Sequence, residues 1–256
     1  MCIDFENSTH IQNIFGRTSL SSSDYSSVVS NVSAAIAEVN KQIYSNFTEE
    51  GGNFLDTDAR GIALLAQTDL VEATAGDLLG DWGNDGITGV SIDSRTIKAN
   101  ELFVAIKGKR DGHNFINDAI KLGAKAALVD HVPVEISSNT PLVLVSCVQE
   151  ALENLAKYRR KRSQAKLVAI TGSVGKTSSK NMLKTILELQ GKTHAAPASF
   201  NNHLGVPLTL ANLPMDATYA VVVIGMNKPG EIEPLAKMTS ADVVFITAIA
   251  EAHLVA

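Results

Sequence analysis

Lys176 and Thr177 close a short glycine-containing segment that reads Thr171-Gly-Ser-Val-Gly-Lys-Thr177. The glycines at positions 172 and 175 allow the backbone to turn its N–H groups toward an anion. The Lys176 ammonium group can then reach the outer phosphates of a nucleotide, and the Thr177 hydroxyl can bind Mg²⁺. The spacing therefore predicts a phosphate-binding loop.

The elements on either side of this segment are those that such a loop requires. An apolar run, 166–170, predicts a strand before it, and helical spacing over 178–190 predicts a helix after it. Ile170 stands where the longer form of the motif has its first glycine. Nucleotide binding is nevertheless favoured over an ordinary glycine turn, because strand, loop and helix follow in the required order.

An unrelated P-loop kinase or NTPase is an alternative, since the loop alone would suffice for it. Such a kinase normally supplies an aspartate at the end of a second strand, where it binds Mg²⁺. The best candidate for that strand, 219–225, ends in Val223-Ile-Gly. This ending counts against the kinase alternative.

Short apolar runs alternate with helical patterns along most of the chain, which is typical of an α/β fold. Strands are predicted at 87–92, 102–106, 126–129 and 142–145, and helices at 64–75, 115–122 and 149–162. The chain of 256 residues is 45% hydrophobic and has two cysteines, Cys2 and Cys147, so a disulfide framework is excluded. No run approaches the length of a membrane helix, and no secretory signal is present, so we expect a soluble, cytoplasmic protein.

The net charge of −5 lies in the first sixty residues, which hold three Lys or Arg against eight Asp or Glu. Eight serines between positions 19 and 33 leave this part little apolar surface. We therefore expect residues 1–62 to be a poorly ordered extension, with a partner-binding segment as the alternative. A basic run, Arg159-Arg-Lys-Arg162, ends the helix at 149–162, and we expect a solvated helix end rather than a nucleic-acid contact.

The loop segment resembles the ATP loop of the Mur ligases, the enzymes that build the peptidoglycan precursor. Asp93-Ser-Arg95, Leu102-Phe-Val-Ala-Ile-Lys-Gly108 and Asp111-Gly-His-Asn-Phe115 resemble the amino-terminal, UDP-sugar-binding domain of that family. Asn201-Asn-His-Leu-Gly-Val-Pro-Leu-Thr-Leu210 and Gly225-Met-Asn-Lys-Pro-Gly-Glu-Ile232 resemble the branch that adds D-alanyl-D-alanine. The resemblance covers about residue 64 to the end of the chain.

The resemblance implies an ATP- and Mg²⁺-dependent ligase that joins D-alanyl-D-alanine to UDP-N-acetylmuramoyl-tripeptide through an acyl phosphate. It implies a small amino-terminal α/β domain over 63–148, followed over 149–256 by part of a P-loop ATPase-like domain with a mainly parallel sheet. No nucleic acid and no membrane insertion are expected.

The resemblance also assigns roles to single residues. Lys176 would stabilise the migrating phosphoryl group, and Thr177 and His253 would bind Mg²⁺. The ATP-binding residues would be Gly172, Ser173, Val174, Gly175, Lys176, Thr177 and Ser178. The residues facing the UDP-sugar and the peptide would be Ser94, Arg95, Asp111, Gly112, His113, Asn201 and Asn202. Without the family, Asp93-Ser-Arg95 is equally well a strand-end turn, His113 a loop histidine and Asn201-Asn202 a polar turn.

Two departures from the family pattern bear on activity. Val223 stands where the family has an acidic Mg²⁺ ligand. Asp242 and Glu251 are carboxylates nearby in the sequence, but neither occupies the position of that ligand in the motif. The chain also stops at Ala256, before the rest of the central domain and the carboxy-terminal domain of a Mur ligase. We therefore expect binding of the substrates with little or no ligase activity, and a non-catalytic nucleotide- or UDP-sugar-binding fragment is the alternative within the family.

Overall fold

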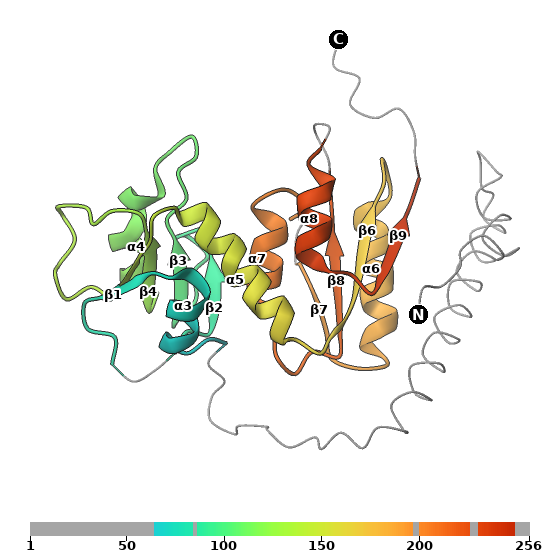
Figure 1. Cartoon of the computed structure of the whole chain (residues 1–256), viewed down its shortest axis with the longest axis horizontal. Coiled ribbons are helices and arrows are strands. Elements are labelled where there is room, and N and C mark those ends of the chain that lie inside the picture. Colours follow the sequence, from blue (N-terminus) through green and yellow to red (C-terminus); the bar gives the residue numbers. More distant parts are fainter. Residues whose placement is uncertain (1–63, 84–85, 197–199, 226–229, 249–256) are drawn as a thin grey trace, which may run out of the picture. The chain divides into compact units, whose positions relative to one another are not determined.

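The structure is a computed structural model, and it describes residues 64–83, 86–196, 200–225 and 230–248 (Figure 1). Contacts divide the chain into Met1–Thr57 and Asp58–Ala256, and all the described residues belong to the second unit. The predicted extension 1–62 lies outside the described residues. The predicted domains 63–148 and 149–256 stay a prediction, because the contacts join both in one compact unit.

The first half of this unit forms a five-stranded sheet in the order β1-β5-β4-β3-β2. Its strands are parallel except β1, which pairs antiparallel with β5 at one edge. All four residues of β4 are buried, as expected for a central strand of a parallel sheet covered on both faces. The elements are α3 (Gln67–Thr74), β1 (Asp77–Leu79), β2 (Gly89–Ser91), β3 (Glu101–Val104), η2 (Gly112–Phe115), α4 (Ile116–Lys121), β4 (Ala126–Val129) and β5 (Leu142–Leu144).

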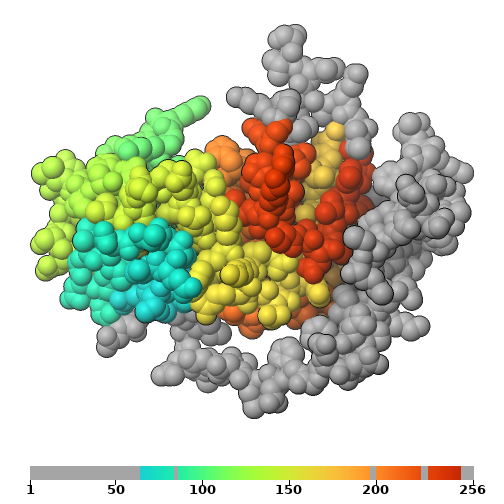
Figure 2. All heavy atoms as spheres, in the orientation of Figure 1, coloured from blue at the N-terminus to red at the C-terminus, as the bar shows by residue number. Residues whose placement is uncertain are grey.

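The second half forms a four-stranded, wholly parallel sheet in the order β7-β8-β6-β9. The strand β8 is buried along its whole length, whereas all four residues of β9 are exposed. Figure 2 shows α8 and β9, both in red, at the surface of the molecule, and α8 packs against α5. The elements are α5 (Val148–Arg162), β6 (Lys166–Thr171), α6 (Lys176–Glu188), β7 (Thr193–Ala195), α7 (Gly205–Ala211), β8 (Tyr219–Val223), α8 (Ile232–Thr239) and β9 (Val243–Ile246).

These elements confirm the predicted α/β class with mainly parallel sheets. Each predicted strand and helix within the described residues is present, and apart from β4, whose ends match, the ends differ by a few residues. The sequence patterns missed β1, β7, β9, η2, α7 and α8. None of the helices in the described part of the chain is long and apolar enough to span a membrane.

The long helix α5 connects the two sheets, because it packs against α3 as well as α7 and α8 (Figure 1). Its basic end is part of this packing. Arg159 is only 2% exposed and donates hydrogen bonds to the carbonyl oxygens of Leu64 (2.7 Å) and Leu213 (3.2 Å from Nε). Arg160 donates to the carbonyl oxygen of Thr239 at 2.8 Å. The predicted solvated helix end is therefore wrong for Arg159 and Arg160, whose guanidinium groups satisfy backbone oxygens of other segments, whereas Lys161 and Arg162 are exposed as predicted.

Candidate functional site

The predicted phosphate loop lies directly after β6, at the carboxyl end of that strand. Gly172 and Gly175 both have positive φ angles, +132° and +83°. A Cβ atom at Gly172 would lie 2.2 Å from Oγ1 of Thr247, so no larger residue fits there. The helix α6 begins at Lys176, immediately after the second glycine. The sequence thus forms the strand, glycine turn and helix start that bind phosphate in other proteins.

The Lys176 ammonium group lies over this loop rather than away from it. Its Nζ donates to the carbonyl oxygens of Gly172 at 2.6 Å and Ser173 at 3.3 Å. A phosphate placed on the loop would offer the ammonium group a charged acceptor in place of these neutral ones. Lys176 is therefore in position to bind an anion at the start of α6.

The end of β9 fixes the loop from the side. The Thr247 hydroxyl contacts the carbonyl oxygens of Thr171 (3.2 Å) and Val174 (2.5 Å), and the backbone N–H of Ser173 donates to the carbonyl oxygen of Ala248 at 2.7 Å. Since the Ser173 N–H is used in this way, an anion would be bound by the first turn of α6, whose N–H groups have no intrahelical acceptors. Sequence reasoning missed Thr247, because a threonine after a strand carries no distinctive signal.

The carboxyl end of β8 lies beside the loop, since β6 and β8 are neighbours in the sheet. The carbonyl oxygen of Asn201 accepts a hydrogen bond from the Gly225 N–H at 2.6 Å, so this residue lies at the same edge. Asn202 has a structural role, because its Oδ1 accepts from the backbone N–H of Gly205 at 2.8 Å and caps α7. The structure thus brings Asn201, but not the side chain of Asn202, to this edge.

The described residues do not complete the predicted Mg²⁺ site. Val223, at the end of β8, is only 3% exposed and offers no oxygen. Asp242 accepts from the Leu167 N–H at 2.8 Å, which places it at the amino end of β6, opposite the loop. His253 lies outside the described residues. Thr177 is then the single predicted Mg²⁺ ligand that the structure describes, and one hydroxyl does not make a site for a cation that prefers six oxygen ligands.

A second group of predicted residues lies at the carboxyl edge of the first sheet. The turn after β2 holds Arg95, whose Nε and Nη2 donate to the two carboxylate oxygens of Asp93 at 2.8 and 2.6 Å. The Arg95 side chain is 78% exposed. The hydrogen bonds from Arg95 lower the pKa of Asp93 to about 2, against an opposing effect of burial. The donors predicted for a diphosphate are thus engaged by a neighbouring carboxylate. Ser94 lies between these two residues in the same turn.

The Asp111-Gly-His113 segment starts η2 at the same edge, after β3. Gly112 is required by close approach, because a Cβ atom would lie 2.7 Å from the carbonyl oxygen of Ile106. Asp111 caps η2 by accepting from the His113 N–H at 3.0 Å. The His113 side chain is 3% exposed, so it is a buried histidine rather than a free loop side chain.

Three further polar residues, which sequence reasoning missed, lie beside His113. Asp130 and His131 follow β4 and contact His113, and Lys107 forms an ion pair with Asp130 at 2.9 Å. The sequence could have indicated Asp130 and His131, because they directly follow the buried strand Ala126–Val129 and ligands of α/β sheets bind where such strands end.

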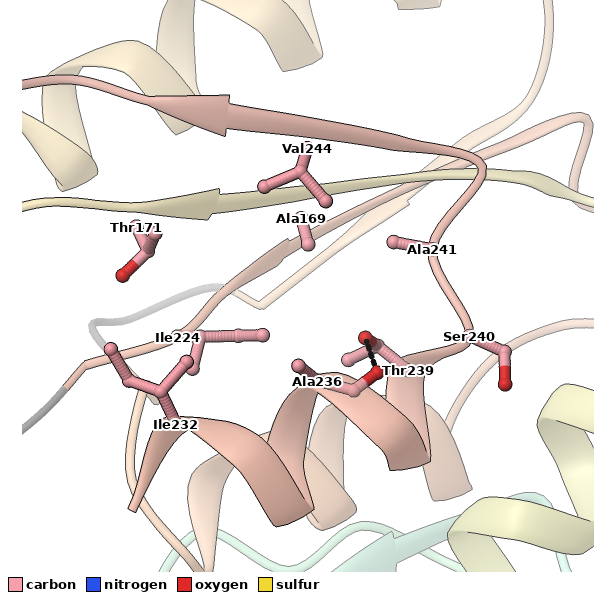
Figure 3. A pocket seen from close by; sticks show the side chains of 9 residues that line it. All are labelled: Ala169, Thr171, Ile224, Ile232, Ala236, Thr239, Ser240, Ala241 and Val244. Atoms are coloured by element: carbon pink, nitrogen blue, oxygen red, sulfur yellow. Dashed lines mark hydrogen bonds between the residues drawn. The ribbon is translucent and has the colours of Figure 1, made fainter. Parts of the chain in front are cut away.

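One apolar cavity of about 300 Å³ lies between α8 and the second sheet (Figure 3). Figure 3 shows that its walls are mostly aliphatic, with Ile224 and Ile232 at one end and Val244 above them. None of the predicted site residues lines it. A cavity of this composition does not suit a nucleotide phosphate. Its lining residues are Ala169, Thr171, Ile224, Ile232, Ala236, Thr239, Ser240, Ala241 and Val244.

Two models of one protein family match the chain. The model described as Mur ligase family, catalytic domain, matches residues 86–167, and the Mur ligase middle domain matches residues 170–255. The UDP-N-acetylmuramoyl-tripeptide--D-alanyl-D-alanine ligase of Rickettsia prowazekii is 43% identical over 165 residues, which cover 64% of this chain and 36% of the relative. The enzyme of the same name from Escherichia coli is 39% identical over 166 residues, covering 64% of this chain and 36% of the relative.

Solved structures agree with these matches. A crystal structure of MurF from Acinetobacter baumannii superposes with a TM-score of 0.64 at 32% identity, covering 75% of this chain and 43% of that chain. MurF ligase from Thermotoga maritima, solved in complex with ADP, superposes with a TM-score of 0.55 at 29% identity, covering 65% of this chain and 38% of that chain. The chain thus spans less than half the length of these relatives.

Proposed function

This chain belongs to the Mur ligase family, and on that premise we propose that it binds ATP on the loop after β6 and UDP-N-acetylmuramoyl-tripeptide at the carboxyl edge of the first sheet. The observation that carries the proposal is the geometry of the loop, with two glycines at positive φ and a lysine folded over them at the start of a helix. The ADP complex of the related Thermotoga maritima enzyme supports the choice of an adenine nucleotide.

In this proposal the residues of the loop have different roles in binding ATP. The backbone of Gly172, Ser173, Val174 and Gly175 shapes the turn, and the first turn of α6, with Thr177 and Ser178, receives the phosphates. Lys176 leaves the carbonyl oxygens that it now contacts and neutralises the outer phosphate. The Thr177 hydroxyl and His253 would hold a Mg²⁺ ion, which would neutralise charge on the phosphates.

The proposed UDP-sugar site consists of Ser94, Arg95 and the turn Asp111-Gly112-His113. These residues follow β2 and β3, two adjacent parallel strands, and ligands of open α/β sheets bind where such strands end. The role of Arg95 requires its guanidinium to be shared between Asp93 and a diphosphate, which its several donors allow. Asn201 and Asn202 would lie near the peptide end of the UDP-N-acetylmuramoyl-tripeptide. The Asn202 side chain would act indirectly, by holding the start of α7 in place.

For the whole protein we propose the reaction named for its relatives, the ATP-dependent joining of D-alanyl-D-alanine to UDP-N-acetylmuramoyl-tripeptide in the cytoplasm. ATP supplies the phosphoryl group that activates the tripeptide carboxylate for attack by the amine. The chain's own residues position the phosphates and neutralise their charge, which is the main requirement of phosphoryl transfer. The 63–148 part would supply the UDP-sugar site and the 149–256 part the ATP site.

A second candidate function is binding of the same ligands without turnover. Val223 favours it, because a buried valine at the end of β8 removes an oxygen from the place where the family has an acidic metal ligand. In this case ligand binding is retained and ligase activity is low.

Ligand-induced thermal stabilisation tests the proposal. ATP and UDP-N-acetylmuramoyl-tripeptide should each raise the unfolding temperature of the chain, because each binds the folded state only. Lys176→Ala should remove the response to ATP and keep the response to the UDP-sugar. Lys184→Ala is the matched control, since Lys184 lies on the same helix and pairs with Glu188 at 3.2 Å.

The outcomes separate the candidates. A response to ATP that survives Lys176→Ala contradicts the assignment of the loop, and a response to ATP without one to UDP-N-acetylmuramoyl-tripeptide contradicts the UDP-sugar site. Release of phosphate in the presence of both substrates and ATP distinguishes the ligase from the binder. Val223→Asp or Val223→Glu should raise that release if the missing oxygen limits it.

A further inference from the structure

Two histidines and an aspartate meet at the carboxyl edge of the first sheet. The Oδ1 atom of Asp130 lies 2.6 Å from Nδ1 of His131 and 3.3 Å from Nε2 of His113. The two imidazole rings stack with their centroids 4.2 Å apart. One ligand atom from each of the three residues lies within 4.8 Å of the others.

The orientation of His113 is fixed from behind by a carboxylate. Its Nδ1 lies 2.6 Å from Oδ1 of Asp111, which favours the tautomer that carries its proton on Nδ1. The Nε2 atom is then the acceptor, and it faces the backbone N–H of Asp130 at a long 3.3 Å. A carboxylate that orients a histidine in this way is the usual outer partner of a metal-binding imidazole.

The Asp130 carboxylate is held in the same manner. Nζ of Lys107 contacts both carboxylate oxygens, Oδ2 at 2.9 Å and Oδ1 at 3.1 Å, and Oδ1 also faces the two histidines.

We infer that His113, Asp130 and His131 form a binding site for a divalent transition-metal ion, with Zn²⁺ as the natural probe. The ligands would be Nε2 of His113, Oδ1 of Asp130 and Nδ1 of His131, with solvent completing a tetrahedron. Imidazole and carboxylate are the ligand types that suit Zn²⁺.

The distances fit such an ion with a small movement of one side chain. Zn²⁺ bonds of about 2.0 Å at tetrahedral angles separate neighbouring ligand atoms by about 3.3 Å, and Asp130 and His113 already stand at that separation. His131 is closer to Asp130, at 2.6 Å, and its ring stacks on His113. Because the His131 side chain is 50% exposed, its ring can turn outward to make room for the ion.

The site is distinct from the phosphate loop and from its nucleotide-held Mg²⁺. It uses two nitrogen ligands, which Mg²⁺ disfavours, and it lies on the other sheet. His113 is also one of the residues proposed to face the UDP-sugar, so the test reads metal affinity in the absence of nucleotide rather than activity.

Isothermal titration of the full chain with Zn²⁺ tests the inference. We expect one equivalent to bind at this site, and His131→Ala and Asp130→Asn, which each remove a ligand atom, each to weaken that binding by at least about tenfold. His131 is half-exposed, so its removal leaves the core intact. The matched control is His203→Ala, which removes an exposed histidine next to α7 and should keep the affinity of the parent chain.

Co²⁺ gives a second readout, because its visible absorption bands report a tetrahedral nitrogen- and oxygen-ligated site directly. The bands should appear with the parent chain and with His203→Ala, and should be lost with His131→Ala. A parent chain that binds no Zn²⁺, or a His131→Ala chain that binds it with unchanged affinity, overturns the inference.

Discussion

Asn212 makes two hydrogen bonds with the backbone of Val90, donating from Nδ2 to the carbonyl oxygen and accepting at Oδ1 from the N–H, both at 2.8 Å. Val90 lies in β2, the edge strand of the first sheet, and Asn212 caps the end of α7 beside the second sheet. A side-chain amide thus takes the place of a neighbouring strand, and it joins the two halves of the unit through β2.

Replacing Asn212 should loosen this junction. Asn212→Ala leaves the N–H and the carbonyl oxygen of Val90 without partners, which should cost about 1–3 kcal/mol in the free energy of unfolding measured with urea. Amide hydrogen exchange at Val90 should accelerate. Asn114→Ala, at an exposed position of η2, serves as the control. Unchanged exchange at Val90 would show that the amide does not act as a strand partner.

The two glycines of the phosphate loop should respond differently to alanine. At Gly172 a Cβ atom meets both the side chain of Thr247 and the backbone of Ala248, whereas at Gly175 its nearest neighbour is 3.8 Å away. Gly175→Ala should therefore cost only the left-handed backbone strain, about 1–2 kcal/mol. Gly172→Ala should cost more in the urea unfolding free energy and should abolish stabilisation by ATP. Equal losses for the two variants would contradict the close approach at Gly172.

Acid should weaken the turn at Asp93. The pKa of this carboxyl is about 2 in the folded chain, against an ordinary value of 3.8, mainly because Arg95 donates to it. Its contribution to stability is complete above the ordinary value and is lost as the pH falls toward about 2. The contribution is small, since Arg95 is exposed to solvent and dissolved salt screens the pair. A carbon-13 NMR titration should find the low pKa, and Arg95→Gln should return it toward 3.8.

Removal of the buried guanidinium of Arg159 should destabilise the chain strongly. Arg159→Met keeps the length of the side chain but leaves the carbonyl oxygens of Leu64 and Leu213 without these donors. The loss should be about 2–4 kcal/mol in the urea unfolding free energy. Lys157→Met, an exposed position on the same helix, should change that free energy little. A small effect at Arg159 would show that solvent replaces the lost donor.

Local patterns were sufficient for the elements that carry the phosphate loop. A run of buried β-branched and aliphatic residues predicted β6 and β8, and the glycines and the lysine follow one another directly, so no tertiary information was needed. The prediction of β4 has the same ends as the strand itself, Ala126–Val129. By contrast, all seven residues of α7 are buried, so the helix has no polar face and its sequence shows no helical period.

The contacts at the site that could not be predicted from the sequence are those between residues far apart in the chain. Thr247 follows the last described strand and yet closes a loop more than seventy residues earlier in the sequence. His113 meets Asp130 and His131 only because β3 and β4 are neighbours in the sheet. Arg159 likewise points inward because it donates hydrogen bonds to the carbonyl oxygens of Leu64 and Leu213. The spacing of residues in α5 does not reveal these partners. Such contacts depend on strand order and on helix packing, which one sequence does not specify.

The last described strand, β9, has a consequence for handling the protein. Four consecutive apolar side chains, Val243, Val244, Phe245 and Ile246, are each 40–60% exposed, and within the described residues β9 pairs with β6 alone. An apolar strand with an open backbone edge is a template for intermolecular β-sheet growth. We therefore expect aggregation of this chain to begin through β9. Val244→Lys should raise the protein concentration at which aggregation starts, without altering the fold.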